Sequence, residues 1–137
     1  MDSKSSNTII EIECITPDNF ESKLIEAEDI MKTSNKPLYI LFTGSKALSG
    51  KSWCPDCEVA EPLILSVLSS IEVGCVILRC LVDREPYRNK EYPYRSNKLL
   101  NISCVPTLMK WENNKCIARL NDMQSQDSTL IMELVNT

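Results

Sequence analysis

Two apolar runs without alternation constrain the fold of this chain more than any other feature. The run "KPLYILFTG" closes at Gly44, and the run "GCVILRCLV" begins at Gly74. An alternating strand buries one face, whereas a continuous apolar run is typical of a strand buried on both faces inside an α/β sheet. The two runs therefore predict central strands of such a sheet, with helices covering both of its faces.

The segments before and between these runs supply a further strand and two helices. Residues 9–15 alternate Ile with Glu and predict a first strand. A helix is predicted from Pro17, because proline suits the first helical position and Thr16 would serve as the cap. A second helix is predicted over residues 55–71, and Pro62 should kink it because proline lacks the N–H that a helix interior uses. The apolar stripe of the first helix consists of Phe20, Leu24, Ala27 and Met31.

The C-terminal part of the chain predicts an antiparallel hairpin and a last helix. Asn113 and Asn114 separate two strand-like runs and favour a hairpin turn. The last helix is expected to begin near Ser125. Its buried side is expected to hold Leu130, Ile131, Leu134 and Val135. The order of elements predicts an α/β fold whose central mixed sheet has a parallel core and an antiparallel C-terminal hairpin.

Length and charge bound the class of protein. The 137 residues suffice for one domain, spanning 1–137, whose first few residues are expected to be disordered. The 15 basic and 19 acidic residues give a net charge of −4, which argues against a nucleic-acid partner. No apolar run approaches the roughly 20 residues that cross a bilayer, so no membrane association is expected. The N-terminal segment lacks the apolar core of a signal peptide, and a cytoplasmic location is therefore expected.

Seven cysteines are many for this length, and an odd number without a secretory signal favours a reducing compartment. Cys54 and Cys57 form a Cys-x-x-Cys pattern at the start of the second predicted helix. With Cys54 as the cap and Pro55 as the first helical residue, the Cys54 sulfur faces the unpaired N–H groups of the helix, which favour a thiolate. Cys57 follows on the same side, close enough for a disulfide. Cys54 is expected to be exposed, whereas Cys57 lies a turn inside.

Other roles for this pair have less support. A closed zinc site takes four ligands, and the chain has no histidine and no second Cys-x-x-Cys, so no metal is expected. A cysteine hydrolase needs a base such as histidine beside its thiol. Thiol–disulfide exchange needs only a stabilised thiolate and a second thiol. Two cysteines placed at a helix start by chance are the remaining alternative.

The surroundings of the pair resemble the thioredoxin family. "WCPDC", which begins at Trp53, resembles the Trp-Cys-x-x-Cys active site, and Pro62 matches the proline that kinks the active-site helix. "CVPTL" resembles the cis-proline loop, with Pro106 at the cis position. The stretch from Phe42 to Pro62 is similar to one branch in particular, the small cytosolic thioredoxin-related disulfide reductases. The resemblance implies a thioredoxin fold.

The same resemblance implies a mechanism and its partners. Cys54 would attack a substrate disulfide, and Cys57 would resolve the mixed disulfide that forms. The site would be shaped by Trp53, Pro55, Asp56, Val105 and Pro106. Electrons would come from NADPH through thioredoxin reductase, with no cofactor bound to this chain. Protein or small-molecule disulfides such as cystine, peroxide reduction and a modulating role in inflammatory signalling are also implied, and the chain is expected to be a monomer.

Some features depart from ordinary thioredoxins. The residues between the cysteines are Pro-Asp rather than Gly-Pro, and the loop from Ser45 to Ser52 is several residues longer. The family's buried aspartate has its matching position near Leu41, in a run that holds no acid. Proton transfer to and from Cys57 is therefore expected to use Asp56, Glu61 or water. These departures predict a range of disulfide substrates narrower than that of ordinary thioredoxins.

The other cysteines are expected to have smaller roles. Cys14, Cys75 and Cys80 lie in predicted strands, where a buried free cysteine acts as a small hydrophobe. Cys116 flanks the hairpin turn as an ordinary strand residue. Cys104 is a possible accessory thiol, because the cis-proline loop of this fold lies against the active site. Its alternatives are an inert loop thiol and a regulatory or intermolecular disulfide.

Two further function classes stay open. A binding adaptor would use the same fold to hold a protein partner, with its redox state as a switch. An oxidase or isomerase is disfavoured by the missing secretory signal. The segment 83–98, with five basic and three acidic residues and three tyrosines, is compatible with docking of an acidic partner or a reductase. Tyrosines folded onto the body of the protein are the favoured interpretation.

Overall fold

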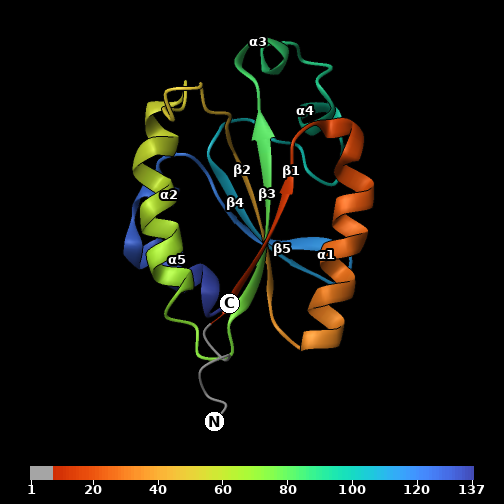
Figure 1. Cartoon of the computed structure of the whole chain (residues 1–137), viewed down its shortest axis with the longest axis vertical. Coiled ribbons are helices and arrows are strands. Elements are labelled where there is room, and N and C mark those ends of the chain that lie inside the picture. Colours follow the sequence, from red (N-terminus) through yellow and green to blue (C-terminus); the bar gives the residue numbers. More distant parts are fainter. Residues whose placement is uncertain (1–7) are drawn as a thin grey trace.

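Figure 1 shows a computed structural model of the chain, in which helices cover both faces of a five-stranded sheet. The structure describes residues 8–137, so the expected disorder of the first few residues concerns a segment outside the described part. The strands are β1 (Ile9–Cys14), β2 (Leu38–Gly44), β3 (Cys75–Val82), β4 (Thr107–Glu112) and β5 (Lys115–Leu120). The helices are η2 (Pro17–Asn19), α1 (Phe20–Ser34), α2 (Pro55–Leu68), α3 (Arg84–Tyr87), α4 (Pro93–Ser96), η3 (Gln124–Gln126) and α5 (Ser128–Val135).

The strands lie in the order β1-β3-β2-β4-β5. β3 pairs in parallel with β1 and β2, whereas β4 pairs antiparallel with β2 and β5. This arrangement confirms the predicted parallel core and antiparallel C-terminal hairpin. Every residue of β2 is buried, because α2 and α5 lie on one face of the sheet and α1 lies on the other (Figure 1). The continuous apolar run was therefore a correct signal of a central strand.

The first helical region begins differently from the prediction. Pro17 opens a short 3-10 turn, and the α-helix itself begins at Phe20. The side chain of Thr16 makes no capping hydrogen bond. Its backbone carbonyl instead accepts a hydrogen bond from the N–H of Asn19 at 3.1 Å, and this three-residue separation is typical of a 3-10 helix. The predicted apolar stripe is confirmed. Phe20 and Ala27 are buried, and Leu24 and Met31 pack against the core.

Two other helix boundaries were also misplaced. α2 ends at Leu68 rather than Ile71, because the N–H of Ile71 donates to the Leu68 carbonyl in a tight turn (3.2 Å). The last α-helix begins at Ser128 rather than near Ser125. Its start is fixed by the Asp127 carboxylate, which accepts hydrogen bonds from the first backbone N–H groups of α5.

The hairpin turn between β4 and β5 confirms the prediction from the two asparagines. Asn113 and Asn114 both have positive φ, 55° and 63°. Two successive residues in the left-handed region are typical of a tight hairpin, and asparagine tolerates this region better than most residues.

The aromatic segment between β3 and β4 packs onto the body of the protein. Tyr94 is 1% exposed, and its ring meets the ring of Phe42 edge-on at 5.0 Å between centroids. Tyr92 is also buried and contacts Tyr94, while Tyr87 lies 6.3 Å from the ring of Trp53. The favoured interpretation of the tyrosines is confirmed. Their packing also places α3 beside the dicysteine motif.

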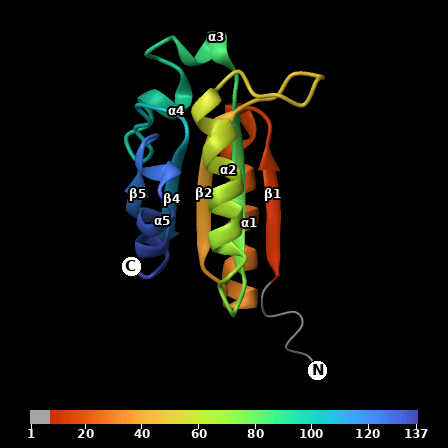
Figure 2. The same ribbon diagram turned by 90° about the vertical axis from the view of Figure 1, so that its left-hand side faces the viewer.

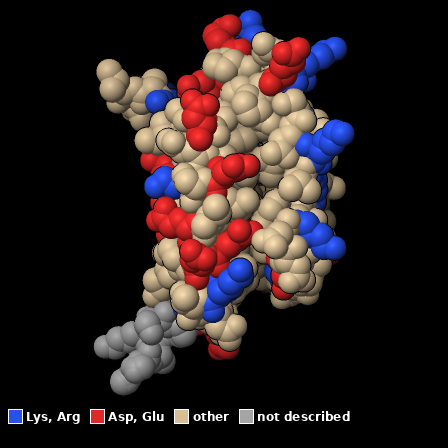
Figure 3. Space-filling model, turned by 90° about the vertical axis from the view of Figure 1, so that its right-hand side faces the viewer, with Lys and Arg blue, Asp and Glu red and all other residues tan. Residues whose placement is uncertain are grey.

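Acidic side chains gather on the surface above α1 (Figure 3). Glu21, Glu26 and Asp29 of α1 are all exposed. This acidic face lies across the sheet from α2, which carries the two cysteines (Figure 1). Within residues 8–137, no helix is long and apolar enough to span a bilayer.

Candidate active site

The two cysteines of the motif occupy the positions predicted for them. Cys54 is the N-cap of α2, Pro55 is its first residue, and Cys57 stands at the third position. The two sulfurs form a disulfide, with 5.2 Å between the Cα atoms. The Cys57 N–H donates to the Cys54 sulfur at 3.1 Å. A helix N-terminus therefore directs a hydrogen-bond donor and its positive end at Cys54.

The accessibility of Cys54 differs from the prediction of an exposed thiol. Cys54 is 5% exposed and Cys57 is fully buried. Cys54 is covered because its sulfur lies 3.6 Å from the carbonyl oxygen of Val105, in the loop across the site. A groove of about 380 Å³ still reaches Cys54. It is lined by Trp53, Cys54, Pro55, Asp56, Tyr87, Ser103, Cys104 and Val105.

The loop across the site contains the predicted cis proline. The Val105–Pro106 peptide bond is cis. Thr107 stabilises this loop, since its hydroxyl donates a hydrogen bond to the Cys104 carbonyl at 2.6 Å. The Cys104 sulfur accepts from the N–H of Asp122 at 3.3 Å, and its side chain is half-buried in the groove wall. Cys104 thus lies in the same groove as Cys54, as the sequence predicted.

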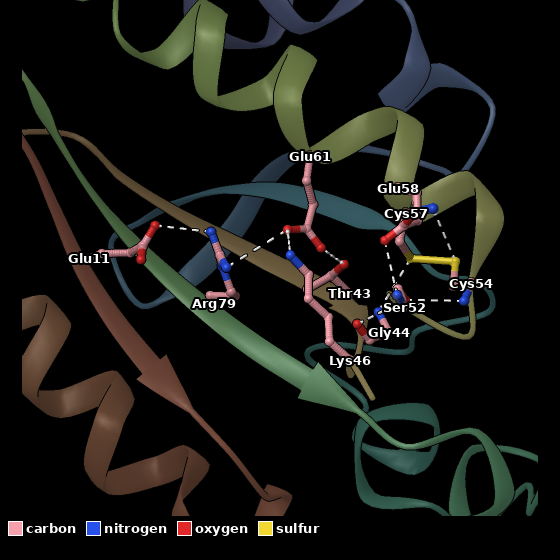
Figure 4. Close-up of polar contacts among 10 residues, drawn as sticks. All are labelled: Glu11, Thr43, Gly44, Lys46, Ser52, Cys54, Cys57, Glu58, Glu61 and Arg79. Carbon is pink, nitrogen blue, oxygen red and sulfur yellow. Dashed lines mark hydrogen bonds and ion pairs between the residues drawn. A yellow bond between two sulfur atoms is a disulfide. The ribbon is translucent and has the colours of Figure 1, made fainter. Parts of the chain in front are cut away.

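The loop from Ser45 to Ser52 projects from the molecule next to the start of α2 (Figure 2). Its base is closed by a bridge between Lys46 and Ser52, while Leu48 near its tip is fully exposed. Ser52 then ties the loop to the site. Its N–H donates to Glu58 at 2.9 Å, and its hydroxyl donates to the Gly44 carbonyl at 3.1 Å (Figure 4).

Gly44, at the end of β2, lies directly behind the disulfide. Its N–H donates to the Cys57 sulfur at 3.3 Å. A Cβ at this position would come within 2.7 Å of the Ser52 hydroxyl, 2.8 Å of the Cys54 Cβ and 3.1 Å of the Trp53 ring. Only glycine lets the strand approach the motif this closely. The sequence showed Gly44 as the end of a strand but not this requirement.

A charged cluster beside the site was only partly foreseen. Leu41 is fully buried, so the position matched to the family's aspartate holds no acid. Glu61 of α2 is buried instead, and it accepts a hydrogen bond from the hydroxyl of Thr43. Arg79 of β3 lies 3.8 Å from one Glu61 oxygen, and Lys46 lies 3.9 Å from it (Figure 4). The signal for Arg79 was a lone cation inside an otherwise apolar strand.

The remaining thiols lie away from this cluster. Cys75 is fully buried, and burial raises its pKa to about 11, which fits an inert core thiol. Cys14 and Cys80 are paired across β1 and β3, and Cys14 also contacts the Tyr94 hydroxyl at 3.4 Å. The hydrogen bond from Cys80 lowers the pKa of Cys14 to about 6, whereas burial raises the pKa of Cys80. These two are core residues, as predicted, but they contact each other. Cys116 lies in β5 and is partly buried.

Solved thioredoxins share this architecture, so the chain has a thioredoxin fold. The thioredoxin pre-protein of Schistosoma mansoni has a TM-score of 0.54 and is 18% identical, over 93% of this chain and 95% of that one. Thioredoxin O1 of Arabidopsis thaliana has a TM-score of 0.52 at 18% identity, with the same coverage of both chains.

Sequence comparison then identifies the family to which the chain belongs among proteins with a thioredoxin fold. The model of the family described as thioredoxin domain-containing protein 17-like, thioredoxin domain, matches residues 16–137, and the chain belongs to this family of thioredoxin-type redox proteins. Human thioredoxin domain-containing protein 17 is 43% identical over 79 residues, which are 57% of this chain and 63% of that protein. The thioredoxin-like protein Clot of Arabidopsis thaliana is 32% identical over 121 residues, which are 87% of this chain and 90% of that protein.

Proposed function

We propose that this chain is a cytoplasmic disulfide reductase that acts by dithiol–disulfide exchange through Cys54 and Cys57. The observation that carries the proposal is the pairing of these two sulfurs at the N-terminus of α2, with one of them at an open groove. Membership in a family of thioredoxin-type oxidoreductases supports the same chemistry.

In the proposed reaction the reduced protein meets a disulfide R–S–S–R′ in the groove. The Cys54 thiolate attacks one sulfur, the S–S bond breaks, and R′S⁻ leaves and takes up a proton. The Cys57 thiol then loses its proton and attacks the Cys54 sulfur, so RS⁻ leaves and the Cys54–Cys57 disulfide remains. The N–H of Cys57 points at the Cys54 sulfur and would stabilise its thiolate before attack.

The groove suggests how a substrate would lie. Val105 faces Cys54 across the site, and its carbonyl oxygen is close to the sulfur. An extended peptide passing through the groove would pair with this backbone, as strands do when they add to an exposed segment. Trp53 is fixed beside the groove because its indole N–H donates to the Val82 carbonyl at 2.8 Å.

The source of electrons and the range of substrates are part of the proposal. We propose recycling by NADPH-dependent thioredoxin reductase, activity on cystine and selected protein disulfides, and reduction of peroxides. A modulating role in inflammatory signalling would follow from reduction of selected proteins. The proposed active form is a monomer.

The direct test is NADPH consumption with thioredoxin reductase and a panel of disulfides. Wild-type protein should support oxidation of NADPH with cystine, and the Cys54→Ser, Cys57→Ser double variant should not. No turnover with any disulfide on the panel would contradict a reductase. A cellular effect that survives in the double variant would favour the adaptor instead.

Asp56 and the Ser45–Ser52 loop are expected to restrict the activity. Asp56 lies in the first turn of α2 and lines the groove next to Cys54. A carboxylate near a developing thiolate opposes its ionisation. In Asp56→Asn, the pH midpoint of Cys54 alkylation should fall. A loop shortened between Lys46 and Ser52 should accept bulky disulfides such as insulin faster. An unchanged alkylation midpoint would remove the charge argument, and unchanged substrate preference would remove the steric one.

A further inference from the structure

Glu61 is a buried carboxylate that has no role in the two sulfur-exchange steps of the proposed reaction. Within residues 8–137 it is the only charged residue that is buried, with 7% of its surface exposed. A buried charge is costly unless it is paired and hydrogen-bonded. Its one direct hydrogen bond comes from the Thr43 hydroxyl, while Arg79 and Lys46 lie at the longer distances of an ion pair. Glu61 is thus held by one hydrogen bond and two longer ion pairs.

Glu61 and Cys57 face the same end of β2. They are four residues apart on α2, so their side chains project from one face of the helix in successive turns. Two neighbouring residues of β2 meet them: Thr43 contacts Glu61, and Gly44 contacts the Cys57 sulfur. Figure 4 shows both side chains on the β2 side of α2.

Water can reach Glu61 from outside the molecule. A cavity of about 340 Å³ is lined by Glu61 together with Gly44, and a second of about 350 Å³ is lined by Glu61 together with Pro62. Cys57 itself is fully buried and lines neither cavity nor the substrate groove. Its proton therefore has no direct exit, whereas a carboxyl group at Glu61 connects the buried end of β2 with solvent.

The resolving step requires such a connection. Cys57 must lose a proton before its sulfur can attack Cys54, and it must regain one when the disulfide is reduced again. We propose that Glu61 accepts the proton of Cys57 through one bridging water and passes it to solvent, and that it returns a proton in the reverse direction. This inference rests on the proposed reaction and names the proton acceptor of its second step.

Asp56 is less well placed for this task. It lines the exposed groove with Trp53 and lines neither cavity at Glu61. Because it precedes Cys57 by one residue, it leaves the helix about 100° away from the Cys57 side chain. The charged groups around Glu61 come from five parts of the chain. They are Lys46 of the loop, Arg79 of β3, Asp83 after β3, Glu58 of α2, and Glu11 and Glu13 of β1.

The two steps can be separated with the aromatic disulfide 5,5′-dithiobis(2-nitrobenzoate), without a reductase or a physiological substrate. Attack by Cys54 releases a first coloured thiolate, and closure by Cys57 releases a second. In Glu61→Gln, which keeps an oxygen for the Thr43 hydrogen bond, the first phase should keep its rate. The second phase should slow at least tenfold near neutral pH, and the deficit should shrink as pH rises and the Cys57 thiol ionises without help. Glu61→Asp should recover part of the rate.

Matched controls separate proton transfer from a structural role. Glu72→Gln removes the same charge from an exposed turn and should leave both phases unchanged. If Glu61→Gln does not fold, Thr43→Val serves instead, since it keeps the carboxylate but removes its hydrogen bond and should alter the pH profile of the second phase only. A second phase in Glu61→Gln with the wild-type rate and pH profile would overturn the inference. So would a deficit equal at every pH. Absence of the first phase in the wild type would instead contradict the proposed function.

Discussion

Replacing Cys57 with serine should turn the chain into a trap for its disulfide substrates. Cys54 keeps its position at the groove and its hydrogen bond from the first turn of α2, so it should still attack. The serine hydroxyl cannot resolve the mixed disulfide, because it is far less acidic and far less nucleophilic than a thiol. Turnover should fall to the uncatalysed rate while mixed disulfides accumulate. Non-reducing mass spectrometry would show the added mass on Cys54.

The matched variant is Cys54→Ser, which should neither turn over nor trap. Cys57 is fully buried and would not meet a substrate in the groove. In the reduced wild type, alkylation near neutral pH should label Cys54 before Cys57, since of these two cysteines only Cys54 lines the groove. Faster labelling of Cys57 or of Cys104 would reverse the assignment. A trapped substrate mapped to Cys104 would do the same, because Cys104 shares the groove.

Gly44→Ala should damage both stability and activity. The new methyl group would lie 2.7 Å from the Ser52 hydroxyl and 2.8 Å from the Cys54 Cβ. Neither neighbour can move away without losing an interaction. The Ser52 hydroxyl donates a hydrogen bond to the Gly44 carbonyl, and Cys54 is the N-cap of α2. Overpacking of this kind costs about 1–3 kcal/mol in free energy of unfolding. Displacement of Cys54 should also lower the rate of disulfide reduction, and urea unfolding with the NADPH-coupled assay would measure both effects.

Gly50→Ala is the matched control for this substitution. Gly50 has a φ of +91°, but a Cβ there would meet nothing within 4 Å. The change should cost only the strain of placing alanine in that region, about 1 kcal/mol. Activity on a small disulfide such as cystine should be retained. If Gly44→Ala were as stable and as active as Gly50→Ala, the close approach of β2 to the motif would have no importance for the site.

The sequence predicted the parts of the fold that depend on local pattern. The continuous apolar runs gave β2 and β3, since burial on both faces leaves no room for alternation. The Cys-Pro-Asp-Cys order gave the start of α2, because a cap residue followed by proline suits a helix start wherever it occurs. Exact helix ends were missed, since capping by Asp127 and the 3-10 turn at Pro17 involve small differences between competing hydrogen bonds.

By itself, then, the sequence determined the order of elements, the central strands and the position of both cysteines on one helix turn. The tertiary structure alone decided how the site works around them. Cys54 is nearly buried because Val105, from a distant loop, lies across it. Glu61 was one of several candidates for proton transfer in the sequence, and only its packing against Thr43 and Arg79 shows that it is buried. Burial and hydrogen bonding between segments far apart in the chain depend on how whole elements pack, and no local pattern of residues records them.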